Sequence, residues 1–225
     1  KVGVFGDVTS TLAASIAAKH SEIFLFHVES GLRSNNLSMP EERNRIMVDA
    51  ISDLLLIPSE DARENLLKER VSSDKIHNVG NIMIDTLFKN KSKIIHNSEY
   101  IKDTLNLNKP YFVITLHRPS NLNDDTLKDI FEAISNFTQD YQVILPAHPR
   151  LKYYIGDNNI ELTNIIFIDP LSYIDFISLV YGCELVLTDS GGIQEETTYL
   201  GINCLTLREE TERPITVQEG TNKVI

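Results

Sequence analysis

Short apolar runs alternate with longer amphipathic segments along the chain. The runs are rich in Val, Ile, Leu and Phe and are bounded by polar or glycine-containing turns, which is typical of buried β-strands. We expect strands over residues 2–5, 23–27, 54–57, 76–79, 111–116, 142–146, 165–168, 184–187 and 204–207. Apolar residues at helical spacing predict helices over residues 11–19, 41–50, 60–69, 124–138, 172–180 and 193–200. Apolar strands that alternate with helices indicate an α/β fold with parallel sheets and helices on both faces.

A polar stretch rich in Lys, Asn and Ser interrupts this pattern between about residues 90 and 110. Pro110 stands directly before another strand, so we place a domain boundary there. We expect one Rossmann-like domain over residues 1–90, a connecting segment over 91–109 and a second Rossmann-like domain over 110–225. In such folds ligands bind at the carboxyl ends of the strands, so a cleft between the two domains is the expected site.

Composition narrows the class of protein. The chain has 225 residues and 42% hydrophobic content, enough for a core, so disorder is excluded. A net charge of −11 argues against nucleic acid and anionic membranes as partners. Cys183 and Cys204 lie in apolar surroundings without C-x-x-C spacing, which indicates reduced core residues in a cytoplasmic protein. The sequence shows neither a signal-peptide pattern nor an apolar stretch near the roughly 20 residues of a membrane helix.

Residues 189–196, Asp-Ser-Gly-Gly-Ile-Gln-Glu-Glu, predict a strand that leads through a glycine turn into a helix. Gly191 and Gly192 allow close approach of a ligand to the backbone, and the first N–H groups of a helix have no partner within it. These donors and the helix dipole suit a phosphate. Glu195 and Glu196 fall in the first turn, where a carboxylate suits the dipole and can reach a ribose hydroxyl. An ordinary capped turn would explain these residues alone about equally well.

Residues 208–214, Arg-Glu-Glu-Thr-Glu-Arg-Pro, shift the balance towards a ligand site, because so charged a run contributes little to a core. Further motifs precede these two: Gly6-Asp7, H-V-E-S-G-L-R at 27–33, P-E-E-R-N-R at 40–45, Gly80-Asn81 with Asp85, and L-H-R at 116–118. In this order they closely resemble the UDP-N-acetylglucosamine 2-epimerase family, of the non-hydrolysing type. The resemblance spans nearly the whole chain.

The sequence departs from the family pattern at Val8, Ser30 and Leu116, where the family commonly has Thr, Ala and Gly. None of these changes removes a charged group, so they bear on substrate detail more than on reaction type. By comparison with the family, we expect about half a domain before Lys1 and a terminal helix or two after Ile225.

The resemblance implies a two-domain, GT-B-like fold and a reaction that inverts C2 of UDP-N-acetylglucosamine (UDP-GlcNAc). UDP is eliminated to leave a 2-acetamidoglucal and is then added back with a proton on the other face, which gives UDP-N-acetylmannosamine (UDP-ManNAc). This chemistry requires carboxylates near C1 and C2 and donors around the diphosphate. It requires neither a metal nor nicotinamide, so no cofactor is expected.

Asp7, Glu29 and Glu41 match the catalytic acids of the family, although the sequence does not divide base from acid among them. Two carboxylates in one cleft repel, so a raised pKa on one of them would suit a proton donor. Structural alternatives exist for two of the acids. Asp7 suits the N-cap of a helix that starts near Thr9. Ser38-Met-Pro-Glu41 is a capping-box pattern with proline in the first turn.

The resemblance also places His117 in the catalytic site, although a lone histidine at a strand end is more often structural. It implies that the substrate is bound by Arg45, Arg118, Ser190, Gly191, Gly192, Glu196 and Arg213. Arg45 lies four residues after Glu41 on one helix face, so it either orients Glu41 or binds the diphosphate. A guanidinium such as Arg213 grips phosphate oxygens bidentately. His148 is a weaker candidate, and His20, His27, His77 and His96 are taken as structural or surface residues.

We therefore expect an epimerase that acts on UDP-GlcNAc, forms a homodimer as family members do, and binds neither nucleic acid nor a membrane. The alternatives are an epimerase for another UDP-2-acetamido sugar, a hydrolysing 2-epimerase, a UDP-sugar glycosyltransferase and a nucleotide-binding fragment without turnover. All of them predict UDP binding at residues 190–196. Only the epimerases require the three acids.

Overall fold

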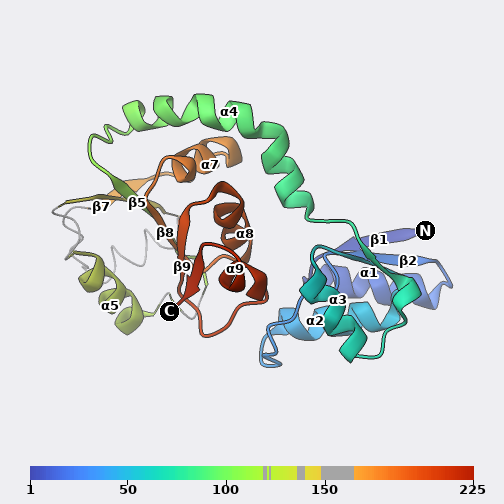
Figure 1. The fold of residues 1–225 in the computed structure, drawn as a ribbon. Helices are drawn as coiled ribbons and strands as arrows, with labels where there is room; N and C mark the ends of the chain where they lie inside the picture. Colours follow the sequence, from blue (N-terminus) through green and yellow to red (C-terminus); the bar gives the residue numbers. More distant parts are fainter. Residues whose placement is uncertain (119–120, 122, 136–139, 148–164) are drawn as a thin grey trace. The chain divides into compact units, whose positions relative to one another are not determined.

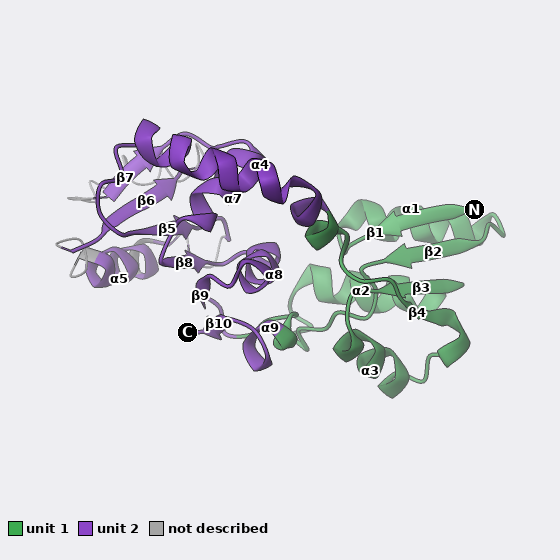
Figure 2. Ribbon diagram, turned by 45° about the horizontal axis from the view of Figure 1, so that its top comes forward, with its two compact units in different colours: residues 1–85, 210–215 green, residues 86–209, 216–225 purple. Residues whose placement is uncertain are grey.

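The computed structural model describes residues 1–118, 121, 123–135, 140–147 and 165–225. These residues form two compact units, coloured separately in Figure 2: residues 1–85 with 210–215, and residues 86–209 with 216–225. Residues 91–109, expected as a connecting segment, lie mostly within one long helix, α4 (Ile82–Thr104), drawn in green in Figure 1. Residues 210–215, expected in the second domain, group with the first unit.

The first unit contains a parallel sheet in the order β1-β2-β3-β4. Its strands are β1 (Val2–Phe5), β2 (Leu25–Val28), β3 (Leu54–Ile57) and β4 (Ile76–Asn78). The strands are joined by α1 (Thr9–His20), α2 (Pro40–Ile51), α3 (Glu60–Lys68) and the short 3₁₀ helix η1 (Ser73–Lys75). Each connection steps to the next strand in the same direction, so right-handed crossovers put these helices on one face of the sheet.

The core of this unit lies between that face and the helices. Val4 and Leu25 from the strands pack with Ala18 of α1 and Val48 of α2. Further along the sheet, β3 packs with α3 in a second cluster that comprises Leu32, Leu55, Ile57, Ala62, Leu66 and Ile76. The polar face of α2 is also turned towards the sheet, because Glu42, Arg45 and Asp49 are all buried.

The second unit contains a parallel sheet in the order β10-β9-β8-β5-β6-β7. Its strands are β5 (Tyr111–Thr115), β6 (Gln142–Pro146), β7 (Ile165–Ile168), β8 (Leu185–Thr188), β9 (Asn203–Thr206) and β10 (Asn222–Val224). The chain runs outward from β5 to β7, returns to β8 beside β5, and then runs outward in the opposite direction. This reversal sends α5 (Asp124–Ser135) to one face and sends α7 (Tyr173–Tyr181) and α8 (Gly191–Leu200) to the other.

Both faces of this second sheet are therefore covered. On the side of α5, Ile114 packs with Leu127 and Phe131. On the side of α7, Val113 packs with Leu179 and Val180. Because β5 is buried on both faces, its sequence is a continuous apolar run rather than an alternating one. The connections diverge after β5 and β8, so the carboxyl ends of these neighbouring strands form a topological switch point.

The expected strands and helices are present with shifts of a few residues at their ends, but α4, α9 (Pro214–Gln218) and β10 were not expected. Helix α4 was missed because its buried stripe is narrow. Leu87, Ile94 and Ile101 recur every seven residues, and most positions between them are polar. Strand β10 is three residues long and carries Asn222 and Lys223, so it lacks the apolar run that marks the other strands.

A buried carboxylate on α2 holds the turn that follows β2. Asp49 is 2% exposed, and its Oδ1 lies 2.6 Å from Nδ1 of His27. Its Oδ2 accepts the backbone N–H of Gly31 at 3.0 Å and lies 2.8 Å from Nη2 of Arg33. Arg33 also donates from Nε and Nη2 to the Glu69 carboxylate, at 2.7 Å each. Asp49 therefore ties both ends of the 27–33 motif to α2.

Replacement of Asp49 by alanine should destabilise the protein by about 3–5 kcal/mol, because the Arg33 charge and the Gly31 N–H would remain buried without this acceptor. The control is Glu64→Ala, which breaks an exposed pair with Lys68 at 3.8 Å and should cost at most about 1 kcal/mol. Urea denaturation followed by circular dichroism measures both. Equal losses in the two variants would show that the Asp49 network does not hold the first unit together.

Candidate active site

Asp7 lies just after β1, where Gly6 turns the chain with a φ of +61°. Its carboxylate Oδ2 is 3.2 Å from Nη1 of Arg45. The side-chain amide of Asn44 donates to the Asp7 carbonyl at 2.7 Å, so two residues of α2 fix this position. The alternative of Asp7 as a helix cap is wrong, because the N-cap of α1 is Val8 and no side chain makes the capping bond.

The surroundings of Asp7 favour its protonated form. Burial raises the pKa of this carboxyl, and the negative charges of Glu212 and Glu41 raise it further. Arg45 and, more weakly, Arg213 oppose the rise, but the pKa remains above its ordinary value. A raised pKa suits a group that must donate a proton.

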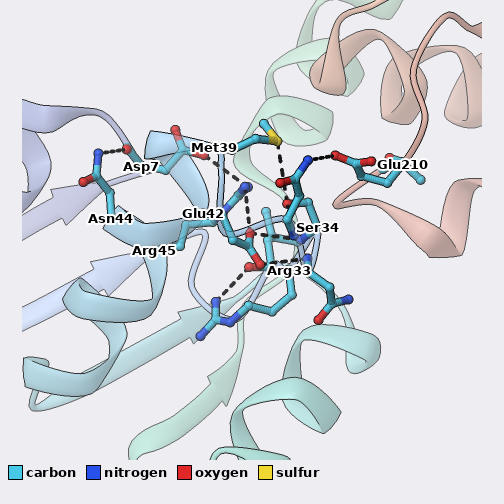
Figure 3. A network of polar contacts seen from close by, with 12 residues as sticks. Asp7, Arg33, Ser34, Met39, Glu42, Asn44, Arg45 and Glu210 are labelled. Atoms are coloured by element: carbon cyan, nitrogen blue, oxygen red, sulfur yellow. Dashed lines mark hydrogen bonds and ion pairs between the residues drawn. The ribbon is translucent and has the colours of Figure 1, made fainter.

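Arg45 is held by Glu42 rather than by Glu41. Its Nη2 lies 3.0 Å from Oε2 of Glu42, and both side chains are buried. The same Glu42 carboxylate accepts the backbone N–H groups of Ser34 at 3.0 Å and Asn35 at 2.9 Å. In Figure 3 the Arg45 side chain lies between Asp7 and Glu42. Arg45 therefore joins Asp7 to the loop after residue 33. Of its two expected roles, orienting Glu41 has no ion pair to support it among the described residues, and binding the diphosphate stays a prediction.

Glu41 is exposed in the first turn of α2. Its proposed capping box does not form, because the N-cap of the helix is Met39 and makes no side-chain capping bond. Ser38 instead donates its hydroxyl to the Asn36 side chain at 2.6 Å. Pro40 does occupy the start of the helix as expected. The Glu41 carboxylate is thus not used as a cap, and it is close enough to Asp7 to raise the pKa of that carboxyl.

Glu29 follows β2 directly and has a strained backbone conformation, with a φ of +64°. The left-handed region costs a residue other than glycine about 1–2 kcal/mol, and such strain tends to gather at ligand sites. Gly31 follows with a φ of +80°, and a Cβ at that position would lie only 2.5 Å from the Ala62 carbonyl oxygen. The turn that presents Glu29 therefore requires glycine two residues later.

Residues 210–215 belong to the first unit together with these acids. Oε1 of Glu210 accepts from the Asn36 side chain at 2.6 Å, as Figure 3 shows. Glu212 and Arg213 are both buried, and both influence the pKa of Asp7. Arg213 therefore groups with the acids of the first unit, whereas its place in the sequence had assigned it to the nucleotide-binding domain.

The second unit carries a tightly bonded pair at its switch point. His117 follows β5 and Asp189 follows β8, and Nδ1 of His117 lies 2.6 Å from Oδ1 of Asp189. Asp189 is fully buried, whereas the His117 side chain remains 59% exposed. The Asp189 carboxylate also accepts the backbone N–H groups of His117 at 3.1 Å and Arg118 at 2.9 Å. Burial alone would raise the pKa of Asp189, but the His117 and backbone hydrogen bonds lower it overall.

The glycine turn leads from this pair into α8. Ser190 is the N-cap of the helix, and its side chain makes no capping bond. Its backbone N–H donates to the Thr188 hydroxyl at 3.0 Å, and its carbonyl accepts from the Gln194 side chain at 3.2 Å. Gly191 and Gly192 begin the helix, so their N–H groups belong to the turn that has no acceptor within an α-helix. This geometry suits a phosphate.

Glu196 is buried one turn further along α8, with 2% of its surface exposed. Desolvation raises its pKa to about 7, the neighbouring Glu195 charge adds to the rise, and a hydrogen bond with Tyr173 opposes it. Its Oε1 is buried and has no hydrogen-bond partner among the described residues. A ligand hydroxyl at this oxygen would therefore satisfy an acceptor that the protein leaves open.

Glu42, Asp49 and Asp189 were not predicted as site residues. The available signal for the two acids on α2 was their spacing, because Glu42, Arg45 and Asp49 lie on one face of the helix.

His148 lies outside the described residues. Within the described part of the chain, no group of three His, Cys, Asp or Glu side chains is arranged to hold a metal ion. Every helix found there is too short or too polar to cross a membrane.

Replacement of Glu29 by glycine should stabilise the protein by about 0.5–1 kcal/mol, because glycine adopts a positive φ without strain. Glu22→Gly is the matched control, since Glu22 is exposed after α1 with a φ of +54° and should gain a similar amount. Thermal unfolding followed by calorimetry measures both variants. A loss of stability in Glu29→Gly alone would mean that the Glu29 carboxylate supports the fold.

Glu196 should make stability depend on pH. The folded-state pKa of about 7 lies above the ordinary 4.5, so the folded protein binds the proton more tightly, and stability falls as pH rises between these values. Glu196→Gln should remove this fall and should therefore stabilise the protein at pH 8 by up to about 3 kcal/mol. Denaturant unfolding at pH 5 and pH 8 tests this, and a wild-type protein no less stable at pH 8 than the variant would contradict it.

A family model for UDP-N-acetylglucosamine 2-epimerase matches residues 1–225. UDP-N-acetylglucosamine 2-epimerase of Methanocaldococcus jannaschii is 40% identical over 235 residues, which cover 100% of this chain and 64% of the relative. UDP-2,3-diacetamido-2,3-dideoxy-D-glucuronate 2-epimerase of Pseudomonas aeruginosa is 36% identical over 231 residues, which cover 100% of this chain and 63% of the relative.

A crystal structure of the M. jannaschii enzyme in complex with UDP-GlcNAc and UDP aligns with a TM-score of 0.89 at 40% identity, covering 100% of this chain and 64% of that one. The chain therefore spans 63–64% of the length of these relatives. This likeness and the two parallel sheets confirm the predicted α/β fold with two Rossmann-like units. The match along the entire sequence shows that the chain belongs to the UDP-N-acetylglucosamine 2-epimerase family.

Proposed function

We propose that the intact protein inverts C2 of a UDP-N-acetylhexosamine and so interconverts UDP-GlcNAc and UDP-ManNAc. The observation that carries this proposal is the acidic centre of the first unit. Asp7 has a raised pKa there, close to Glu41 and Glu212 and paired with the buried Arg45. Nucleotide binding alone would not require such a centre. A reaction that moves a proton at carbon requires a proton donor and a base.

The proposed reaction proceeds in two reversible steps. In the first, the bond between C1 and the diphosphate oxygen breaks, the electron pair stays with UDP, and a base removes the C2 proton to leave a 2-acetamidoglucal. In the second, UDP adds back to C1 and a proton is delivered to the opposite face of C2. We assign that delivery to Asp7, because its raised pKa makes the protonated form more accessible than in an ordinary aspartate. Glu29 and Glu41 are then the candidates for the base.

The second unit supplies the groups for the nucleotide. Ser190, Gly191 and Gly192 at the start of α8 would bind the diphosphate through their N–H groups. Arg118 would add a cationic donor there. Arg45 and Arg213 of the first unit are likewise proposed as substrate ligands, because a guanidinium suits phosphate oxygens. The open oxygen of Glu196 would accept ribose hydroxyls, since a donated hydrogen bond stabilises a carboxylate that burial otherwise disfavours.

Two relatives bear on the identity of the sugar. The M. jannaschii relative is named for UDP-N-acetylglucosamine, and the P. aeruginosa relative is named for a 2,3-diacetamido glucuronate. An epimerase for another UDP-2-acetamido sugar is therefore the second candidate. A homodimer remains part of the proposal. A cytoplasmic location does as well, and the two buried free cysteines, Cys183 and Cys204, suit a reducing compartment.

Proton NMR of UDP-GlcNAc with the intact protein in D2O tests the proposal. The C2 proton signal should disappear while the anomeric signal of a manno-configured UDP sugar appears. Asp7→Asn, Glu29→Gln and Glu41→Gln should each slow the reaction about 100-fold or more. Glu22→Gln, which changes an exposed carboxylate after α1, should react at the wild-type rate.

Two negative results of this NMR experiment would have different meanings. Conversion of UDP-2,3-diacetamido-glucuronate but not of UDP-GlcNAc would keep the reaction and change the sugar. An unchanged spectrum with both sugars, while UDP still binds, would contradict an epimerase and leave a protein that only binds the nucleotide or transfers the sugar.

A further inference from the structure

The pair of Asp189 and His117 stands at the place where the fold collects ligand-binding groups. Strands β5 and β8 are neighbours in register, with Thr115 opposite Thr188. Their connections then diverge to opposite faces of the sheet, which opens the switch point at their carboxyl ends. His117 and Asp189 are the side chains that follow there, and the glycine turn at Ser190 comes next.

The groups that contact the Asp189 carboxylate are hydrogen-bond donors, so the carboxylate acts as an acceptor. It receives the backbone N–H groups of His117 and Arg118, and the Asn121 side chain also donates to it at 3.2 Å. These donors hold the carboxylate ionised despite complete burial, consistent with its lowered pKa. An ionised carboxylate has no proton to donate. The contact of 2.6 Å between its Oδ1 and Nδ1 of His117 therefore requires the proton to lie on Nδ1.

This constraint fixes the state of the other ring nitrogen. With the proton on Nδ1, Nε2 carries the lone pair of the neutral imidazole, and it becomes a second donor when the ring is protonated. The His117 side chain is 59% exposed even though its partner is fully buried, so the ring extends from the Asp189 anchor into solvent. A ligand anion held at the neighbouring turn would meet this Nε2 edge.

We propose that Asp189 is a positioning residue that holds His117 with its proton on Nδ1 and so presents Nε2 to the diphosphate of the substrate. The inference rests on the proposed epimerase function and adds to it the residue through which His117 acts. When the C1–O bond breaks, the electron pair remains on the diphosphate oxygen. The ring, which takes its second proton from solvent, donates a hydrogen bond from Nε2–H to that oxygen, and the ionised Asp189 balances the charge of the imidazolium. Re-addition of UDP reverses the step.

A double-mutant cycle tests whether Asp189 acts through His117. Asp189→Asn should lower kcat of the intact protein by at least about tenfold, because a neutral amide does not balance the charge of the imidazolium that donates its Nε2–H to the diphosphate. In a His117→Ala background the same change should cost nothing further. Asn121→Ala is the matched control. It removes another donor to the same carboxylate and leaves the histidine contact in place, so kcat should change less than threefold.

The cycle separates positioning from a structural role. Equal losses of kcat in the wild-type and His117→Ala backgrounds would mean that Asp189 only holds the loop, and this would overturn the inference. No loss in Asp189→Asn alone would overturn it as well.

A spectroscopic measurement decides the inference without turnover. With ¹⁵N-labelled histidine in the intact protein, the neutral His117 ring should show its proton on Nδ1, and Asp189→Asn should shift the population towards Nε2. A wild-type ring with its proton on Nε2 would overturn the inference. A protein that shows the Nδ1 tautomer but does not epimerise any UDP-2-acetamido sugar would retain the positioning and refute the proposed function.

Discussion

The buried polar face of α2 is the constraint on which the first unit depends. Charged side chains that face a sheet must each find a partner, because an unpaired charge in the interior is very costly. Asp49 meets this requirement by binding the turn after β2, and Glu42 meets it by binding the loop at residues 34–35. Arg45 lies between Glu42 and Asp7 and bonds to both. Charge pairing thus connects sequence motifs that are separated along the chain.

In the second unit one buried carboxylate, that of Asp189, holds the backbone in the corresponding way. Its strands reverse their order at β5 and β8, which makes a switch point of the kind where α/β folds bind ligands. Asp189 satisfies the N–H groups of His117 and Arg118 there and leaves the His117 ring accessible. In both units, therefore, a buried carboxylate fixes the backbone that presents the chemical groups.

Much of the fold was predictable because parallel strands buried by helices are continuous apolar runs. The structure departs from the sequence expectation where the role of a residue depends on the direction in which its side chain points around a helix. Glu41 and Glu42 are adjacent, and successive residues point about 100° apart around a helix, so only the face shared with Arg45 and Asp49 identifies the buried one. The grouping of residues 210–215 with the first unit was also not predictable. It arises from tertiary contacts such as that between Asn36 and Glu210, which leave no local pattern.

Burial and neighbouring carboxylates favour the protonated form of Asp7 more than in an ordinary aspartate. Carbon NMR of the protein labelled with ¹³C at aspartate carboxyl groups measures this directly, with Asp7→Asn used to assign the signal. The titration midpoint of Asp7 should lie above its ordinary value of 3.8. A midpoint at or below 3.8 would mean that Arg45 outweighs burial and would contradict the proposed role of Asp7 as the proton donor.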